Sequence, residues 1–405
     1  MRILFLNDFI PPRHVGGPGK RNFETAVKLK DLGHDVFFIT SCQKKEQEIE
    51  DEKLGVKIFN VYSDYPLYLR DYFNIYNPKV MKKVKKIMKE IHPDVVHVDT
   101  VHTYLSYACL KIARKFSKAV FLHSRDFMLF NYGKFLQKER ECGRVDYKVS
   151  WFDNLKKGGK RFNPFRNFLI KRYLKYVDKI FAISDELAKA LLQNGITNVA
   201  VLHNGFPLYE KEPEFCELES KKILLSGRLN EAKGVYALLD AFPLIKLKIP
   251  EAKIVLVGVD GEEKKRIDYY VLKNRLGKED IEISGWIPGE QMYSILKSAA
   301  VVCSPSLYPD PLLAGSNYEA ASFKKPVITT CFGGAKEFVL DGKTGYVVNP
   351  FKKEELADRV VDLLSDEEKA RRFGEAAYLR LKTDFSLDEY AKKLLDWYGS
   401  FLKNN

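Results

Sequence analysis

Cysteine is a residue that this sequence has little of, and its spacing excludes several kinds of site. Only 6 of the 405 residues are cysteines, and they form neither a C-x-x-C pair nor a cluster with histidine. Such spacing indicates neither a zinc site nor a disulfide framework. Unpaired thiols are typical of a reducing compartment, so we expect free cysteines and a cytoplasmic location.

Long apolar runs are also missing from the sequence. No run of 18 apolar residues occurs, so we expect no membrane-spanning helix. The apolar start is interrupted at Asn7 and Asp8 and stops at Pro11 and Pro12, which makes it too short and too polar for a signal peptide.

Basic residues outnumber acidic ones by 67 to 54, which gives a net charge of +13. Such an excess attracts anions in general, whether nucleic acid, anionic lipid or phosphorylated small molecules. A nucleic-acid-binding protein would cluster its lysines with stacking aromatic residues, whereas these lysines are spread over most predicted helices. We therefore expect a lysine-rich solvated surface and no nucleic-acid partner.

Short apolar runs alternate with helical segments along the whole chain. The predicted strands cover residues 2–6, 36–40, 56–61, 95–98, 119–123 and 179–184, and then 222–226, 253–258, 280–284, 300–304 and 326–330. Strands separated by helices of about a dozen residues indicate βαβ units and parallel sheets, and hence the α/β class.

A polar stretch divides this series into two doubly wound domains. We predict a first domain over residues 1–206, a linker over 207–220 and a second domain over 221–385. A last helix over 386–405 carries an apolar stripe that needs a partner surface, which the first domain can offer. Ligands of such sheets bind outside the carboxyl ends of the strands, so we expect the active site in a cleft between facing domains.

The loop over residues 226–234 carries two cations at the carboxyl end of a predicted strand, Arg228 and Lys233. Two cations in one loop can hold a diphosphate without magnesium. They also stabilise the charge that grows on a diphosphate when its bond to a sugar breaks. An ordinary charged surface loop is the alternative interpretation, and the loop alone does not decide between them.

Two further segments of the second half have the pattern of a ligand site. Prolines between residues 305 and 311 end a strand and pre-set a helix over 312–323, whose first N–H groups and dipole favour an anion. Glu319 lies on this helix among apolar neighbours, and a buried carboxylate needs partners such as ribose hydroxyls. Gly333 and Gly334 follow the next strand and allow close approach of a ligand to the backbone.

Taken in order, these motifs resemble those of glycosyltransferase family 4, and the resemblance covers nearly the whole chain. The matching positions are Gly227-Arg228, Lys233-Gly234, Pro305-Ser306, Glu319-Ala320, Pro326-Val327, Gly333-Gly334, Glu337, Asp341-Gly342 and Gly345. The resemblance implies the GT-B fold, with two facing Rossmann-like domains. It also implies a retaining transferase whose donor is a nucleotide-sugar, UDP- or GDP-linked, with no metal and no separate cofactor.

The resemblance also assigns roles to individual residues. Arg228 and Lys233 would bind the diphosphate, and Glu319 the ribose. The full set of implied donor contacts is Gly16, Gly17, Asn204, Arg228, Lys233, Leu312, Leu313, Glu319, Gly333 and Gly334.

The sequence departs from the family at one acidic position. The family usually has a second Glu eight residues before the one at Glu319, where this chain has Pro311. Asp310 is the nearest acid, one residue out of register and one methylene shorter. Either Asp310 reaches the hydroxyls of the donor sugar, or the contact is lost and the sugar specificity differs.

The first half supplies the remaining predicted site residues. Its Gly16-Gly17 loop lacks the GxGxxG pattern, which argues against a nicotinamide enzyme. His123 ends a predicted strand and matches a His-Asp pair of the family near the transferred sugar, although a capping histidine is the simpler interpretation. Ser124 stands where the family usually has the Asp of this pair. Whether Asp126 takes over the role of that Asp is open at this point. The predicted catalytic residues are thus His123, Asp126 and Asp310.

Residues 131–179 are unusually basic and aromatic, with Lys156, Lys157, Lys160 and Arg161 preceding a run of phenylalanines. This composition is typical of a surface that docks on an anionic membrane, as a lipid-linked acceptor would require. A helix packed on the sheet is the alternative. The expected partners are therefore a nucleotide-sugar, a glycan or lipid-linked acceptor, and the inner face of a membrane.

Two other functions fit the same fold. A sugar-nucleotide epimerase would need several acids and histidines for proton abstraction, and the segment around His123 is the only such cluster in the sequence. A non-catalytic sugar-nucleotide binder would explain the missing glutamate.

Overall fold

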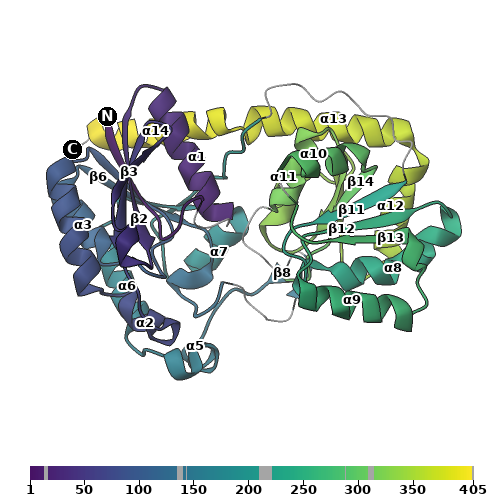
Figure 1. The fold of residues 1–405 in the computed structure, drawn as a ribbon, viewed down its shortest axis with the longest axis horizontal. Coiled ribbons are helices and arrows are strands. Elements are labelled where there is room, and N and C mark those ends of the chain that lie inside the picture. The colour runs from purple at the N-terminus through teal and green to yellow at the C-terminus, as the bar shows by residue number, and fades with distance from the viewer. Residues whose placement is uncertain are drawn as a thin grey trace. The chain divides into compact units, whose positions relative to one another are not determined.

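The computed structural model describes residues 1–12, 17–134, 140–142, 144–208, 221–287, 289–308 and 314–403. Contacts divide the chain into two compact units (Figure 1). Unit 1 comprises Met1–Leu136, Tyr147–Pro207 and Phe385–Asn405, and unit 2 comprises Gln137–Asp146 and Leu208–Asp384. Most of the predicted linker, from residue 209 to 220, lies outside the described residues.

Unit 1 is built on an eight-stranded sheet in the order β10-β9-β6-β5-β1-β2-β4-β3. All neighbouring strands are parallel except β3 and β4. The strands are β1 (Arg2–Leu6), β2 (Asp35–Cys42), β3 (Glu50–Lys53), β4 (Val56–Tyr62), β5 (Val95–Val98), β6 (Ala119–Ser124), β9 (Lys179–Ala182) and β10 (Val199–Val201). The central strands β1, β5 and β6 are mostly apolar and almost entirely buried, because helices cover both faces of the sheet.

The helices of unit 1 form two layers. The α1 helix (Gly17–Asp31) packs against α14 (Leu387–Lys403), while α3 (Pro78–Ile91), α4 (Cys109–Phe116) and α6 (Arg166–Leu174) pack against one another in sequence. The α14 helix buries Tyr390, Leu394 and Tyr398 in the core of unit 1. The remaining helices are α2 (Arg70–Phe73), α5 (Trp151–Gly158), α7 (Asp185–Gln193) and the 3-10 turns η1 (Lys45–Gln47), η2 (Leu67–Leu69), η3 (Phe127–Leu129) and η4 (Gly159–Arg161).

Unit 2 is built on a parallel six-stranded sheet in the order β13-β12-β11-β14-β15-β16. The strands are β11 (Lys222–Ser226), β12 (Lys253–Val257), β13 (Ile281–Ser284), β14 (Val301–Ser304), β15 (Val327–Thr330) and β16 (Gly345–Val348). The helices are α8 (Val235–Lys248), α9 (Gly261–Lys273), α10 (Gly289–Ser298), α11 (Gly315–Ser322), α12 (Lys353–Ser365), α13 (Glu367–Asp384) and the turns η5 (Glu231–Lys233), η6 (Lys278–Asp280) and η7 (Gly333–Glu337). The strand order reverses between β11 and β14, which is where doubly wound sheets bind ligands.

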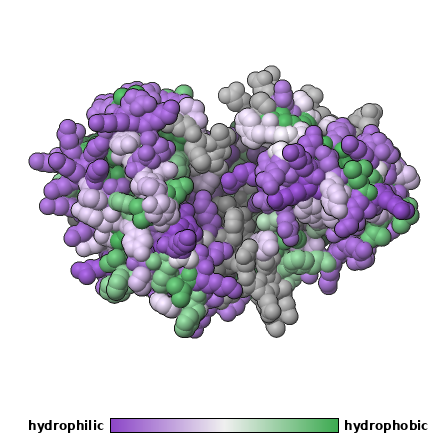
Figure 2. All heavy atoms as spheres, turned by 60° about the horizontal axis from the view of Figure 1, so that its bottom comes forward, coloured by the Kyte–Doolittle hydropathy of each residue, from purple (hydrophilic) through white to green (hydrophobic). Residues whose placement is uncertain are grey.

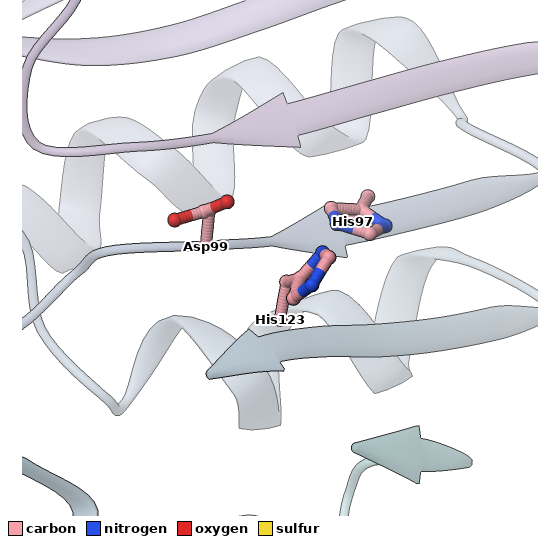
Figure 3. A group of neighbouring side chains, drawn as sticks. All are labelled: His97, Asp99 and His123. Atoms are coloured by element: carbon pink, nitrogen blue, oxygen red, sulfur yellow. The ribbon is translucent and has the colours of Figure 1, made fainter. Parts of the chain in front are cut away.

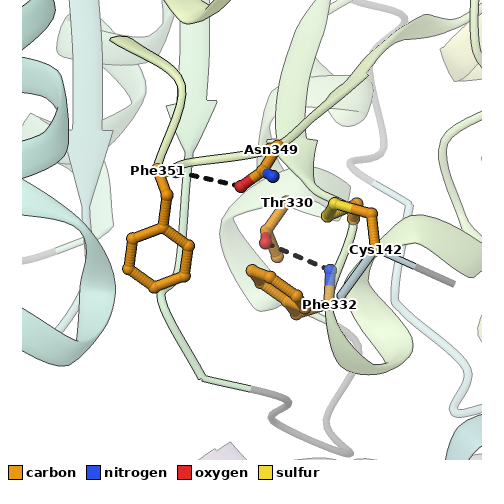
Figure 4. Close-up of a disulfide and its surroundings, with 6 residues drawn as sticks. Cys142, Thr330, Phe332, Asn349 and Phe351 are labelled. Atoms are coloured by element: carbon orange, nitrogen blue, oxygen red, sulfur yellow. Dashed lines mark hydrogen bonds between the residues drawn. A yellow bond between two sulfur atoms is a disulfide. The ribbon is translucent and has the colours of Figure 1, made fainter. Parts of the chain in front are cut away.

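One feature of unit 2 corrects the expectation that all thiols are free. Cys142 forms a disulfide with Cys331, with Cα atoms 5.5 Å apart (Figure 4). Cys142 lies between the two strands of a short hairpin, β7 (Arg140–Glu141) and β8 (Arg144–Val145), and Cys331 directly follows β15. The two cysteines are 189 residues apart in the sequence, so their spacing gave no sign of the pair. Cys109 and Cys303 are free and buried, as expected.

Candidate functional site

The predicted diphosphate loop lies at the carboxyl end of β11 in unit 2. Arg228 is exposed two residues after the strand, and Lys233 is half-buried at the end of η5. Gly234 then takes a left-handed conformation, with φ of 79°, and leads into α8. The loop therefore presents two cations at the edge where the parallel strands of this sheet end.

Two backbone contacts attach this loop to the segment that follows β14. The N–H of Leu307 donates to the carbonyl of Ala232 at 3.0 Å. A Cβ atom on Gly234 would lie 1.9 Å from the carbonyl oxygen of Pro305, so only glycine allows this approach. The ends of β11 and β14 are thus held together at the point where the strand order reverses.

A buried polar network joins α11 to η7, and sequence reasoning missed it. Ser304 donates to the Asn317 side chain at 2.6 Å, and Asn317 donates to Thr329 at 3.2 Å and to the carbonyl of Ala335 at 3.4 Å. Asn317, which is fully buried, thereby fixes α11 against the turn that carries Gly333 and Gly334. The available signal was a polar amide two positions before Glu319, in a helix that the sequence predicts to be largely buried.

Glu319 lies on α11 and is half-buried, and Gly333 and Gly334 are buried at the start of η7. Unit 2 therefore brings Arg228, Lys233 and the two glycines to the edge where its strands end, and α11, which carries Glu319, is attached to the end of β14 at the same edge. Of the other predicted site residues, Gly16, Asp310, Leu312 and Leu313 lie outside the described residues. Their roles stay predictions.

In unit 1, the structure places His123 in the interior rather than at the surface. The ring is 1% exposed, packs on Phe181, and has Nδ1 3.1 Å from the hydroxyl of Tyr390 on α14. Its neighbour His97 makes the matching contact, with Nδ1 2.8 Å from the hydroxyl of Tyr398. Burial lowers the pKa of His123 well below its usual value and that of His97 to about 3. Both rings are therefore neutral, and the catalytic role of His123 stays a prediction.

Asp99 joins these two histidines in a cluster whose ligand-type atoms lie within 4.8 Å of one another (Figure 3). In the described part of the chain, the Nε2 atoms of both rings have no hydrogen-bond partner. The carboxylate of Asp99, however, is paired with Arg125, whose Nε lies 2.5 Å from Oδ2. Because this guanidinium already supplies a positive charge, the cluster does not favour a metal cation.

Arg125 also contacts Asn204, one of the predicted donor contacts, although sequence reasoning gave Arg125 itself no role. Its Nη1 donates to Oδ1 of Asn204 at 2.5 Å, which ties the turn at Asn204 to the end of β5 through Asp99. Asp126, the next residue, caps η3 by accepting from the N–H of Met128 at 2.9 Å. Its Oδ2 atom lies 3.5 Å from Nε2 of His102. Gly17 is exposed at the start of α1.

Asp8, two residues after β1, is a buried carboxylate to which the sequence analysis gave no functional role. It accepts hydrogen bonds from the N–H groups of Thr103, Tyr104 and Leu105 at 2.6, 2.9 and 2.6 Å. Burial raises its pKa to about 6, against the opposite effect of these three donors. Asp8 thereby fixes the loop that follows β5.

Two family models match the chain in sequence. Residues 15–209 match Glycosyltransferase Family 4, and residues 210–380 match Glycosyl transferases group 1. An uncharacterized glycosyltransferase of Methanocaldococcus jannaschii is 24% identical over 412 residues, which cover 96% of this chain and 97% of that protein. Spore coat protein SA of Bacillus subtilis is 29% identical over 187 residues, but this match spans only 49% of that protein and 45% of this chain.

A solved structure has the same fold. The crystal structure of Anabaena HepE in complex with UDP aligns with a TM-score of 0.70 and 17% identity, over 99% of this chain and 100% of that one. Both units thus have the Rossmann-like architecture that the sequence analysis predicted. With two matching family models and this fold, the chain belongs to the family 4-like glycosyltransferases of the GT-B fold and is a transferase enzyme.

Proposed function

We propose that this enzyme transfers a sugar from a UDP- or GDP-linked donor to a glycan or lipid-linked acceptor, with retention of the anomeric configuration. The observation that carries the proposal is the arrangement at the edge of the unit 2 sheet. There the loop of Arg228 and Lys233, helix α11 and turn η7 are held together by backbone contacts and by the network around Asn317. The complex of HepE with UDP supports a uridine nucleotide as the first donor to test.

In the proposed reaction, the bond between the anomeric carbon and the β-phosphate oxygen breaks. A bond from the acceptor oxygen to the anomeric carbon forms on the same face of the sugar. The proton of the acceptor hydroxyl passes to the departing phosphate, so that atoms and charges balance without a carboxylate nucleophile. Arg228 and Lys233 stabilise the charge that develops on the diphosphate, and Glu319 accepts hydrogen bonds from the ribose hydroxyls.

Nucleoside diphosphate binding, measured by isothermal titration calorimetry, tests the donor site. Removal of one charge-assisted contact costs roughly 1.5–3 kcal/mol, so Lys233→Ala and Glu319→Gln should each bind roughly 10- to 150-fold more weakly. Both variants should keep the circular dichroism spectrum of the wild type. Lys273→Ala, at the exposed end of α9, is the matched control and should bind normally. Unchanged affinity in both site variants would refute the assignment.

Proton NMR of the first product tests the stereochemistry. Retention predicts the anomeric configuration of the donor, read from the coupling constant of the anomeric proton before mutarotation. A first product with the opposite configuration would exclude retention and the same-face route.

A lipid-linked acceptor would place the enzyme at the inner face of a membrane. Among the described residues, no helix is both long and apolar enough to cross a bilayer. We propose that the contact with the membrane is peripheral and is made through a surface of unit 1.

A further inference from the structure

Exposed hydrophobic side chains are concentrated in two segments of unit 1. Of the 21 large hydrophobic side chains that are exposed among the described residues, 9 lie between residues 67 and 76 or between 151 and 168. They are Leu67, Tyr68, Tyr72, Tyr76, Trp151, Phe152, Leu155, Phe165 and Phe168, and we refer to them as the aromatic face. The sequence analysis singled out residues 131–179, which contain the second segment, but not the first segment.

The two segments form one surface. The hydroxyl of Tyr72 donates to the carbonyl of Phe162 at 3.1 Å, and η2 and α2 both contact η4. Beneath them, the fully buried side chains of Arg166 and Asp71 pair at 3.3 Å and attach α6 to α2. Figure 1 shows α2, α5 and α6 together at one end of unit 1. A buried ion pair under the surface makes the aromatic face a fixed feature rather than two independent loops.

The α5 helix has its polar and apolar sides reversed. Its buried side chain is Asn154, which donates to the carbonyl of Phe130 at 3.1 Å. Trp151, Phe152 and Leu155 instead point outward, and Phe152 is 75% exposed. A surface helix normally buries its apolar side. An outward apolar side, continuous with further exposed aromatic rings, indicates a partner that covers it.

The charge around the aromatic face identifies that partner. Residues 147–177 contain nine Lys and Arg but only one acidic residue, Asp153, which is used in the capping box of α5. Lys156, Lys157 and Lys160 are exposed beside the aromatic rings. Figure 2 shows hydrophobic patches among hydrophilic surface on this part of unit 1. Aromatic rings interleaved with lysines match the headgroup region of an anionic bilayer, whereas a second copy of this chain would bring like charges together.

We propose that the aromatic face docks on an anionic lipid bilayer. Phe152, Phe165 and Phe168 enter the headgroup region, and Lys156, Lys157 and Lys160 contact the lipid phosphates. Arg161 contributes less to this contact because it lies 4.0 Å from the buried carboxylate of Asp71. The consequence for acceptor choice rests on the proposed glycosyl transfer, because docking brings the enzyme to acceptors carried by lipid.

Co-sedimentation of the full chain with vesicles tests the docking. Wild type should bind phosphatidylcholine vesicles that contain phosphatidylglycerol at low salt, lose binding at high salt and ignore pure phosphatidylcholine. Two triple variants, Phe152→Ser with Phe165→Ser and Phe168→Ser, and Lys156→Glu with Lys157→Glu and Lys160→Glu, should each bind more than tenfold more weakly.

Matched controls come from α8 and α9 in unit 2. Leu247→Ser with Tyr269→Ser and Leu272→Ser removes side chains at least as exposed, 81%, 66% and 66%. Lys264→Glu with Lys265→Glu and Lys273→Glu makes the same change in net charge. Both control variants should bind vesicles as the wild type does. Equal loss in controls and face variants would overturn the assignment of the surface.

Failure of this inference can be told apart from failure of the proposed function. Absence of wild-type binding to anionic vesicles at low salt, with nucleoside diphosphate binding intact, overturns the docking alone. Loss of nucleoside diphosphate binding with vesicle binding intact overturns the donor site alone. Concentration-dependent dimerisation that the phenylalanine variant abolishes would assign the face to a second copy and also overturn the proposal.

Discussion

Gly234 and Pro305 approach each other so closely that a single methyl group would not fit between them. A Cβ atom on Gly234 would lie 1.9 Å from the carbonyl oxygen of Pro305, and the φ angle of Gly234 is 79°. The contact holds the turn with Lys233 against the end of β14, and so joins two parts of the proposed donor site.

Gly234→Ala should therefore damage both stability and donor binding. The left-handed conformation alone costs an alanine roughly 1–2 kcal/mol. The backbone shift that relieves the clash should raise the total loss of unfolding free energy to at least about 2 kcal/mol. Urea denaturation measures it, with nucleoside diphosphate titration beside it. Gly261→Ala, at the start of α9 with no neighbouring atom within 4 Å of its Cβ, should be neutral or slightly stabilising. Equal behaviour of the two variants would contradict the role of the contact.

Asn317→Ala should loosen α11 from η7. The substitution removes one hydrogen bond each from Ser304, Thr329 and the carbonyl of Ala335, while the hydroxyls of Ser304 and Thr329 keep their contact with each other at 3.0 Å. The lost bonds should cost roughly 1–3 kcal/mol of unfolding free energy. Affinity for nucleoside diphosphate should fall as well, because Glu319 and the two glycines lose their fixed relation. Asn274→Ala is the control for loss of an amide, because the Asn274 side chain donates to the carbonyl of Tyr270 at the exposed end of α9. Unaltered affinity for the nucleotide would show that the network serves stability only.

Transfer activity should persist in excess EDTA. In the proposed mechanism, the positive charges of Arg228 and Lys233 stabilise the diphosphate, so no metal ion is needed there. Sugar release or transfer, assayed before and after chelation, is the measurement. Complete loss of activity that magnesium or manganese restores would show that a metal is required.

Reduction of the disulfide between Cys142 and Cys331 should destabilise unit 2. Its cross-link restricts a long loop in the unfolded chain, and such bonds typically contribute roughly 2–4 kcal/mol. Thermal unfolding with and without dithiothreitol measures the effect in the wild type. In Cys142→Ser the same reductant should have no effect, and a shift of equal size there would assign the change to another cause.

Stability should fall as the solution becomes more acidic, in part because of His97. Its folded pKa of about 3 lies below the unfolded value of 6.5, so the unfolded chain binds the extra proton between these values. The contribution of His97 is complete above pH 6.5 and is lost as pH falls, by up to about 1.4 kcal/mol per pH unit. In urea titrations, the stability of the wild type relative to His97→Phe should therefore fall as pH decreases.

The titration of Asp8 changes stability with pH in the opposite direction to that of His97. Asp8 is present in both the wild type and the His97→Phe variant. Its folded pKa of about 6 exceeds the ordinary 3.8, so its contribution is greatest below pH 3.8 and is lost as pH rises through 6. Asp8 therefore cancels from the difference between wild type and variant. Parallel pH profiles would show that His97 does not titrate as its burial requires.

The predicted strands of unit 2 agree with β11 to β15 within one residue at each end, because buried parallel strands are continuous apolar runs. The β3 strand was missed for the converse reason. Its sequence, Glu50–Lys53, is charged throughout, and it sits at the edge of the sheet, where polar side chains stay in water. The predicted helix over 312–323 contains α11, Gly315–Ser322.

Local pattern by itself determined the alternation of strands and helices, the loop with Arg228 and Lys233, and the glycines at the ends of strands. These features depend on the residue types within short stretches of the chain, because those types favour a strand, a helix or a turn before any tertiary contact forms. Only the tertiary structure decided which distant residues meet. It paired Cys142 with Cys331, buried His123 under α14, and turned Asn154 inward on α5. The order of strands and the packing of helices set these contacts, and no spacing along the chain encodes them.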